Sequence, residues 1–323
     1  MKTVSVIVPV YNAEKTVTHL LGNLLHQTLP DMEVILVNDT STDNSLKILS
    51  DAKAQFPDTV VLIDSPENKG PGGARNLALD VAQGAYIGFA DADDLLDTRM
   101  YELLYNKATE GDYDIVDCGF LDEEHDRAVC FTGDDCTGVL NDRQRSDLIV
   151  AGGYLWSRIY RKSLFTVPKK LLFRERCTLS DADSLTALIA RASSAGNVKE
   201  ILYRYHYDPH SVSRLLHDPP RYCKNLMAAM QGVYDAVCFM PNYEGLRDAV
   251  EYEILQMFSY AVNMSYKGLY DRSFPAAGET LRQLVSLGRR LVRSIRMEEN
   301  PYVKAKIPGK DLQLMRQAIR EYG

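Results

Sequence analysis

The sequence lacks the features that mark membrane-spanning, secreted and metal-stapled proteins. Its 323 residues contain no run of 18 apolar residues, which a membrane-spanning helix would need. Six cysteines form no CxxC pair and no zinc-ligand spacing, so we expect reduced thiols in a reducing compartment. The apolar run at residues 4–10 is too short for a secretory signal. These absences favour a cytoplasmic protein.

Charge and composition exclude further classes. The chain has 37 Lys and Arg against 44 Asp and Glu, and this net charge of −7 argues against a nucleic-acid partner. With 46% hydrophobic residues, 20 Gly and 13 Pro, the composition is that of a globular protein and not of a disordered or collagenous chain. A chain of this length usually forms two domains.

Strand and helix patterns alternate in the first third of the chain. Residues 4–10 form a nearly continuous apolar run, which is typical of a strand buried on both faces of a parallel sheet. Residues 14–27 carry apolar side chains at helical spacing, and strand patterns recur at 33–38, 60–64 and 86–90. The alternation predicts an α/β fold with a doubly wound sheet.

The rest of the chain is less regular. Residues 112–210 mix short strand patterns with helix patterns, and helical periodicity dominates after about residue 217. Residues 281–320 hold ten Lys and Arg against three Asp and Glu, a net charge of +7. Within residues 278–297 an apolar stripe opposes arginines, so this helix either contacts an anionic membrane or packs its stripe inside the protein and leaves the arginines in solvent.

Polar and glycine-rich segments follow four of the predicted strands. In an open α/β sheet, ligands bind beyond the carboxyl ends of the strands, and this rule selects residues 9–12, 38–39, 68–76 and 91–94. The glycine-rich segment has neither GxGxxG nor GxxxxGK[ST] spacing. Its glycines would let a ligand approach the backbone, with Arg75 available to anions, or they only shape the turn that opens a helix.

Three carboxylates stand within four residues at Asp91-Ala-Asp93-Asp94. Residues i and i+2 of an extended stretch point to the same side, so Asp91 and Asp93 can face one ligand together. Carboxylate oxygens suit Mg²⁺ or Mn²⁺, usually with phosphate oxygens completing the shell. Alternatively, the acids stabilise the N-terminus of a following helix through its dipole.

Taken in order, these motifs resemble those of the family 2 glycosyltransferases, inverting enzymes with the GT-A fold. The resemblance covers about residues 4–213, two thirds of the chain. It rests on VSVIVPVYN at 4–12, VNDTSTD at 37–43, NKG and ARN within 68–76, FADADD at 89–94, WSRIY at 156–160, Ser180-Asp181 after Phe173, and residues 202–213.

The resemblance implies a fold and a domain plan. We expect a GT-A (nucleotide-diphospho-sugar transferase) fold with a mainly parallel sheet, plus a C-terminal helical region. Residues 1–217 would form the catalytic domain, in which 1–110 bind the nucleotide and 111–217 the acceptor. Residues 218–323 would be helical, because the paired prolines 219–220 punctuate the chain there.

The resemblance also assigns roles to individual residues. The nucleotide-binding residues would be Pro9, Tyr11, Asp39, Arg75 and Asp91. Of these, Tyr11 and Asp39 would hold the base, Arg75 would lie beside the base or ribose, and Asp91 would contact the ribose. Asp93 would ligate a Mn²⁺ or Mg²⁺ ion between the two phosphates. Asp181 would be the general base, although its place before a helix also suits a cap.

Four further residues have weaker assignments. Trp156 either forms a platform for the acceptor or packs in the core. Arg158 holds an anionic acceptor or the diphosphate, or pairs with a surface carboxylate. His206 and His210 contact the diphosphate, complete the metal shell or make ordinary hydrogen bonds. Departures from the family pattern occur at Asn38 (for Asp), Thr40 (for Gly), Ser180 (for Glu), His206 (for Arg) and His210 (for Gly or Asn).

The resulting prediction is a metal-dependent inverting glycosyltransferase of the hexosyltransferase type. The donor would be a nucleotide-diphosphate sugar, with UDP as the expected nucleotide. The acceptor would be a saccharide or lipid-linked saccharide of a surface polysaccharide, and the basic helix would place the enzyme at the inner face of the cell membrane. The alternatives are a sugar-nucleotide nucleotidyltransferase, or a non-catalytic module that binds a nucleotide or a sugar.

Overall fold

The chain folds into two compact units. The computed structural model describes residues 2–177, 179–206, 218–292 and 297–323. The first unit comprises Met1–Gln144, Ala151–Asp181 and Arg191–Pro209, and the second comprises Arg145–Val150, Ala182–Ala190 and His210–Gly323. Two short helical stretches from the middle of the chain therefore group with the C-terminal helices. The predicted boundary residue, 217, lies outside the described residues.

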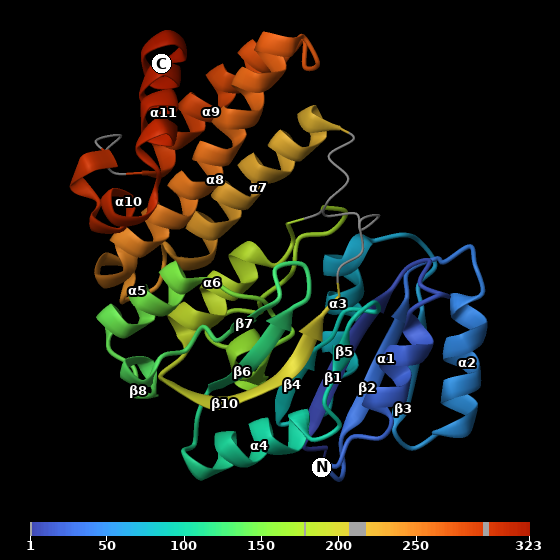
Figure 1. Cartoon of the computed structure of the whole chain (residues 1–323). Helices are drawn as coiled ribbons and strands as arrows, with labels where there is room; N and C mark the ends of the chain where they lie inside the picture. The colour runs from blue at the N-terminus through green and yellow to red at the C-terminus, as the bar shows by residue number, and fades with distance from the viewer. Residues whose placement is uncertain (1, 178, 207–217, 293–296) are drawn as a thin grey trace. The chain divides into compact units, whose positions relative to one another are not determined.

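One large sheet organises the first unit (Figure 1). Its strands run in the order β3-β2-β1-β4-β9-β6-β10-β5, with β7 beside β6 and β8 beside β10. The strands are β1 (Val4–Val10), β2 (Glu33–Asn38), β3 (Val60–Asp64), β4 (Tyr86–Phe89), β5 (Leu95–Leu96), β6 (Ile115–Asp122), β7 (Arg127–Val129), β8 (Gly138–Val139), β9 (Arg158–Arg161) and β10 (Ser194–Tyr205). Strands β1 to β4 pair in parallel, as does β6 with β10, whereas β5, β7, β8 and β9 pair antiparallel. The predicted, mainly parallel α/β sheet is confirmed.

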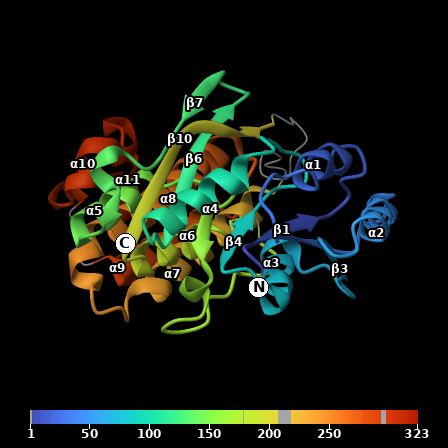
Figure 2. The ribbon, with the colours of Figure 1, turned by 90° about the horizontal axis from the view of Figure 1, so that it is seen from below.

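Helices cover both faces of the parallel part of this sheet. The helices of the first unit are α1 (Val17–Leu24), α2 (Ser45–Gln55), α3 (Gly70–Val81) and α4 (Met100–Glu110). Figure 2 shows α1 and α3 on opposite sides of β1. Five of the seven side chains of β1 are wholly or almost wholly buried valines or isoleucine. The continuous apolar run in the sequence follows from this two-sided cover.

The second unit is a helical assembly. It contains most of α5 (Asp142–Ala151) and α6 (Ala182–Arg191), together with α7 (Pro219–Val237), α8 (Tyr243–Asp271), α9 (Ala277–Leu291), α10 (Pro301–Lys306) and α11 (Gly309–Tyr322). The long helix α8 packs against α7, α9, α10 and α11. Its buried side chains include Leu246, Ile254 and Phe258. The predicted C-terminal helical region is confirmed.

The basic amphipathic segment packs its apolar stripe inside this second unit. Leu281, Leu284 and Val285 of α9 are fully buried, because the helix packs on α7 and α8. Its basic face is exposed, where Arg282 pairs with Glu279 at 3.0 Å. Of the two alternatives for this helix, the apolar stripe therefore packs inside the protein, and it is not free to insert into a membrane. Among the described residues, no helix is long and apolar enough to cross a membrane.

Candidate active site

The site is built first at the carboxyl ends of β1 and β2. The backbone N–H of Asp39 donates to the Val10 carbonyl at 2.9 Å, which continues the strand pairing by one residue. The Asp39 side chain then accepts a hydrogen bond from the Lys69 N–H at 2.8 Å. Burial raises the pKa of Asp39, and the backbone N–H groups of Lys69 and Gly70 oppose the rise. Asp39 thus ties the end of β2 to the glycine-rich segment, at the predicted nucleotide edge.

Asn38, a departure from the family pattern, has a structural partner. Its side-chain amide donates to Asp64 Oδ1 at 2.7 Å, and its carbonyl oxygen accepts from the Ser41 N–H at 3.2 Å. Asn38 and Asp64 are register partners at the ends of β2 and β3. An aspartate at position 38 would set two carboxylates against each other there, which explains why an amide occupies the position.

The turn after Asp39 keeps a glycine-like backbone despite its threonine. Thr40 has φ of 62° and Asn12 has φ of 50°, both in the left-handed region. Asn12 is held by the Ser41 hydroxyl, which accepts from its N–H at 3.0 Å. The neighbouring Tyr11 is 53% exposed at the end of β1. Tyr11 therefore presents an accessible ring beside Asp39, as its predicted contact with a base requires, and Pro9 precedes it within the strand.

Arg75 connects the glycine-rich segment to the acidic motif. It is almost completely buried between the rings of Phe89 and Phe173, at 5.9 and 5.6 Å from their centroids. Its guanidinium lies 3.3 Å from Asp91 Oδ1 and donates to Ser180 Oγ at 3.4 Å. Three predicted elements, the ARN motif, the acidic motif and the segment of the predicted base, therefore meet at Arg75.

The carboxylates of the acidic motif lie in one another's electric field. Burial raises the pKa of Asp91 to about 6, and the negative charges of Asp93 and Asp181 add to the rise. Arg75 opposes it without cancelling it. The charges of Asp93 and Asp181 thus oppose the ionisation of Asp91. A divalent cation relieves such repulsion, and carboxylate oxygens are the donors that Mg²⁺ and Mn²⁺ prefer, so the donor chemistry of Asp91 and Asp93 suits such an ion.

Asp94 has a structural role within the motif. It is buried, it accepts from the Tyr203 hydroxyl at 2.7 Å, and it accepts from the His206 N–H at 2.9 Å. Burial, with the charges of Asp91 and Asp93, raises the pKa of Asp94 well above its usual range. Asp94 thereby fixes the end of β10 beside the acidic motif. The His206 ring lies near Glu123, with Nδ1 2.9 Å from its carboxylate. His210 lies outside the described residues.

The structure places Trp156 and Arg158 inside the protein. Trp156 is 3% exposed and stacks on Tyr203 at 4.1 Å, so the packing role is the one it has here. Arg158 is 1% exposed, donates to the Gly152 carbonyl at 3.0 Å and has its Nε 4.0 Å from Asp117. The carboxylate partner of Arg158 is therefore buried, and the alternative of a surface carboxylate was wrong.

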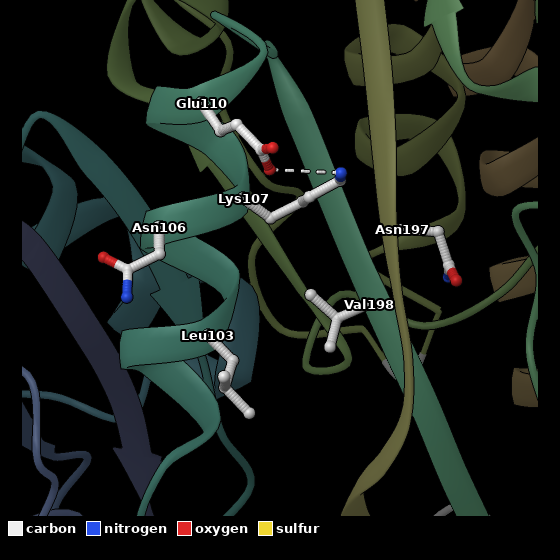
Figure 3. Close-up of a pocket in the computed structure, with 6 residues that line it drawn as sticks. All are labelled: Leu103, Asn106, Lys107, Glu110, Asn197 and Val198. Atoms are coloured by element: carbon white, nitrogen blue, oxygen red, sulfur yellow. Dashed lines mark hydrogen bonds and ion pairs between the residues drawn. The ribbon is translucent and has the colours of Figure 1, made fainter.

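Two other features lie apart from these residues. A pocket of about 440 Å³ lies between α4 and the first half of β10. Figure 3 shows the residues that line it, which are Leu103, Asn106, Lys107, Glu110, Asn197 and Val198. The active-site residues follow the carboxyl ends of the strands, whereas Asn197 lies near the amino end of β10. Asp122, Glu124 and His125 gather at the β6–β7 turn, where Arg127 already pairs with Asp122 at 3.3 Å.

Fold and site together define an α/β protein in which Asp39, Arg75 and the acidic motif gather at the carboxyl ends of the parallel strands. The family model described as "Glycosyl transferase family 2" matches residues 5–174. EpsJ of Bacillus subtilis (strain 168), named an uncharacterized glycosyltransferase, is 30% identical over 78% of this chain and 73% of its own length. The poly(ribitol-phosphate) beta-glucosyltransferase of Bacillus spizizenii is 40% identical over 35% of this chain, but over 18% of its own length.

Solved structures share the fold. Residues 1–349 of TarS from S. aureus, crystallised with UDP, match with a TM-score of 0.73 and 21% identity, over all of this chain and 91% of theirs. The mannosyltransferase PcManGT from Pyrobaculum calidifontis, in complex with GDP-Man and Mn²⁺, matches with a TM-score of 0.54 and 17% identity, over 98% of this chain and 87% of that one. The chain belongs to glycosyl transferase family 2 and has a GT-A-like fold with a C-terminal helical region.

Proposed function

We propose that this protein transfers a sugar from a nucleotide-diphosphate sugar, with UDP as the nucleotide, to a hydroxyl of a saccharide or lipid-linked saccharide. The observation that carries the proposal is the convergence on Arg75, which lies 3.3 Å from Asp91 Oδ1 and donates at 3.4 Å to Oγ of Ser180, the residue before Asp181. Family membership supports transfer chemistry, the UDP complex of TarS supports the nucleotide, and the poly(ribitol-phosphate) relative supports a surface-polymer acceptor.

The donor would lie along the carboxyl ends of β1, β2 and β4. Tyr11 offers an exposed ring to the base, beside Pro9 and Asp39, and Arg75 positions Asp91 for the ribose. Asp93 would hold Mn²⁺ or Mg²⁺, which supplies charge neutralisation for the departing diphosphate. Because negative charge grows on that group in the transition state, neutralisation there lowers the barrier more than it strengthens substrate binding.

The acceptor hydroxyl would be activated by Asp181. A carboxylate within about 3 Å of a hydroxyl takes its proton as the new bond forms, which is worth roughly 10²–10⁴-fold in rate. A single base on the side opposite the leaving group gives inversion. The hydrogen bond from Arg75 to Ser180 Oγ supports this role, because Ser180 precedes Asp181 and the same guanidinium lies 3.3 Å from Asp91 Oδ1.

The first test is thermal unfolding with UDP, GDP, TDP or CMP, each with and without Mn²⁺. A ligand at about 100 times its Kd adds roughly 2.7 kcal/mol to the stability of the folded state, which raises the midpoint by several degrees. We expect the largest shift with UDP and Mn²⁺, and its loss in Asp93→Asn. A shift that is equal with and without Mn²⁺ would refute the metal role.

Asp181→Asn tests the base. The variant keeps the size of the side chain but cannot accept a proton, so we expect UDP binding as in the wild type and sugar transfer reduced by at least 10²-fold. Unchanged transfer would refute the assignment. A wild-type protein that binds UDP but turns over no UDP-sugar, to any saccharide or to water, would favour the non-catalytic module.

We further propose a cytoplasmic enzyme that contacts the membrane surface through charge alone. The apolar stripe of α9 is buried, whereas Arg282, Arg289 and Arg290 are exposed. Such a face can bind anionic headgroups without insertion.

A further inference from the structure

An aromatic stack in the first unit ends in one exposed ring. Tyr154 stacks on Trp156 at 4.7 Å with 7° between the ring planes, and Trp156 stacks on Tyr203 at 4.1 Å with 12°. Tyr154 is 41% exposed, whereas Trp156 and Tyr203 are buried. Tyr205, which is half-buried, also stacks on Tyr154 at 6.0 Å, so Tyr154 is the most exposed ring of a stack that continues into the core.

Buried residues fix the position of Tyr154. The two residues before it, Gly152 and Gly153, have φ of 71° and 123°, a backbone that favours glycine. The buried Arg158 donates to the Gly152 carbonyl at 3.0 Å. A Cβ atom on Gly153 would lie 2.7 Å from an Arg158 nitrogen and 2.9 Å from the Phe131 ring. The turn at Gly152 and Gly153 is thus packed closely against Arg158 and Phe131, which fixes the position of the Tyr154 ring.

Tyr203, at the buried end of the stack, is hydrogen-bonded to the acidic motif. The Tyr203 hydroxyl donates to Asp94 Oδ2 at 2.7 Å and accepts from the Asp91 N–H at 3.3 Å. Burial raises the pKa of the Tyr154 hydroxyl, Tyr205 and the charges of Asp122 and Asp181 add to the rise, and Arg127 opposes it. The stack is therefore joined through Tyr203 to Asp91, and Asp91 shares Arg75 with Ser180, the residue before the proposed base.

We propose that Tyr154 is the platform of the acceptor subsite, on which a pyranose ring of the acceptor saccharide stacks. This inference rests on the proposed function. A sugar ring has an apolar face of C–H groups and a polar rim, so it suits a rigid aromatic face edged by charged side chains. A single preorganised ring is too small an apolar surface for docking a protein, which needs a much larger patch. Stacking on Tyr154 would hold an acceptor hydroxyl near Asp181.

The test uses the fluorescence of Trp156. It is the only tryptophan of the chain, so the protein's tryptophan emission reports on this stack. The probes are the methyl glycosides of glucose, galactose and N-acetylglucosamine, titrated against the wild type, Tyr154→Ala and Tyr154→Phe. We expect a saturable change in the wild type, affinity weakened about tenfold or more in Tyr154→Ala, and affinity close to the wild type in Tyr154→Phe, because the ring and not the hydroxyl carries the contact.

Tyr270→Ala is the matched control, because Tyr270 is 94% exposed on α8 and has no place in the stack. UDP-dependent thermal stabilisation is measured on the same samples and should be the same in the wild type and Tyr154→Ala. Equal glycoside affinity in these two proteins, or no glycoside response in the wild type, overturns the platform. Joint loss of glycoside and UDP binding in Tyr154→Ala overturns it in favour of a structural role. Absence of UDP stabilisation in the wild type counts against the proposed function instead.

Discussion

Single side chains in the site can be divided by whether their partners are near in sequence. The effect of the Asp93 charge on Asp91 was predictable, because both carboxylates belong to one short segment. The contact of Asn38 with Asp64 was not, because it depends on the register between β2 and β3. Likewise, Arg158 meets Asp117 because the two are register partners in β9 and β6. Sequence patterns identify residue types, whereas registers decide which of them touch.

Thr40 offers a test of backbone strain at the nucleotide edge. A β-branched residue at φ of 62° is held in a sparsely populated conformation, which costs about 1–3 kcal/mol. We expect Thr40→Gly to raise the free energy of unfolding by roughly 1 kcal/mol, since relief of strain exceeds the added flexibility of the unfolded chain. Urea unfolding measures the change. Thr40→Ala keeps the positive φ and should gain less, and a Thr40→Gly protein less stable than the wild type would contradict the strain.

At the scale of elements, helix α3 packs closely against the segment that carries Asp181, the predicted general base. A Cβ on Gly72 of α3 would lie 2.0 Å from the Arg174 carbonyl oxygen and 2.9 Å from Ser180 Cβ. The glycines of residues 68–76 were predicted to serve a ligand or a turn. The structure shows an additional reason for them, which is that a segment about 100 residues later passes against the start of this helix.

Gly72→Ala and Gly22→Ala form a matched pair of helical substitutions. Gly72→Ala must displace residues 174–180, so we expect a loss of about 2 kcal/mol or more in stability and a loss of transfer activity. Gly22 of α1 has nothing within 4 Å of the added atom, so Gly22→Ala should stabilise by roughly 0.5–1 kcal/mol with activity unchanged. Chemical unfolding and a transfer assay on both variants measure this. Similar effects at the two positions would show that the crossing does not constrain the site.

The ionisation of Glu253 in α8 should make the stability of the helical unit depend on pH. Burial raises the pKa of Glu253 to about 7 from 4.5, and Lys306 opposes the rise. Because the folded state holds the proton more tightly than the unfolded one, this group's contribution to stability is complete below pH 4.5 and is lost as pH rises to about 7. Glu253→Gln cannot ionise. We therefore expect it to match the wild type near pH 4.5 and to be more stable by roughly 1–2 kcal/mol at pH 8.

Thermal unfolding across this pH range measures the difference. Lys306→Met provides the complementary variant, because removal of the opposing charge should enlarge the loss of stability above pH 7. A constant difference between wild type and Glu253→Gln at every pH would show that Glu253 does not titrate in this window.

At the scale of the whole molecule, the sequence predicted the architecture better than the division into units. The parallel strands β1 to β4 and the late helices follow from apolar runs and helical periodicity. The second unit also recruits Arg145–Val150 and Ala182–Ala190, and no linker signal marks these short crossings. Such segments join a unit through buried faces, as Leu148 and Leu188 show, and an apolar side chain does not reveal which core it enters.

The positive charge of the chain is concentrated near its C-terminal end. Residues 281–320 hold ten Lys and Arg against three Asp and Glu, although the chain as a whole has a net charge of −7. Because the apolar stripe of α9 is buried, attraction to a membrane would be purely electrostatic and screened by salt. We expect flotation with anionic vesicles at low salt, release at about 0.5 M salt, and none with neutral vesicles. Charge reversal at Arg289 should weaken binding and leave the unfolding midpoint nearly unchanged, since its side chain is exposed. Binding that persists at high salt would instead require an apolar contact, and failure to bind at low salt would remove the membrane role.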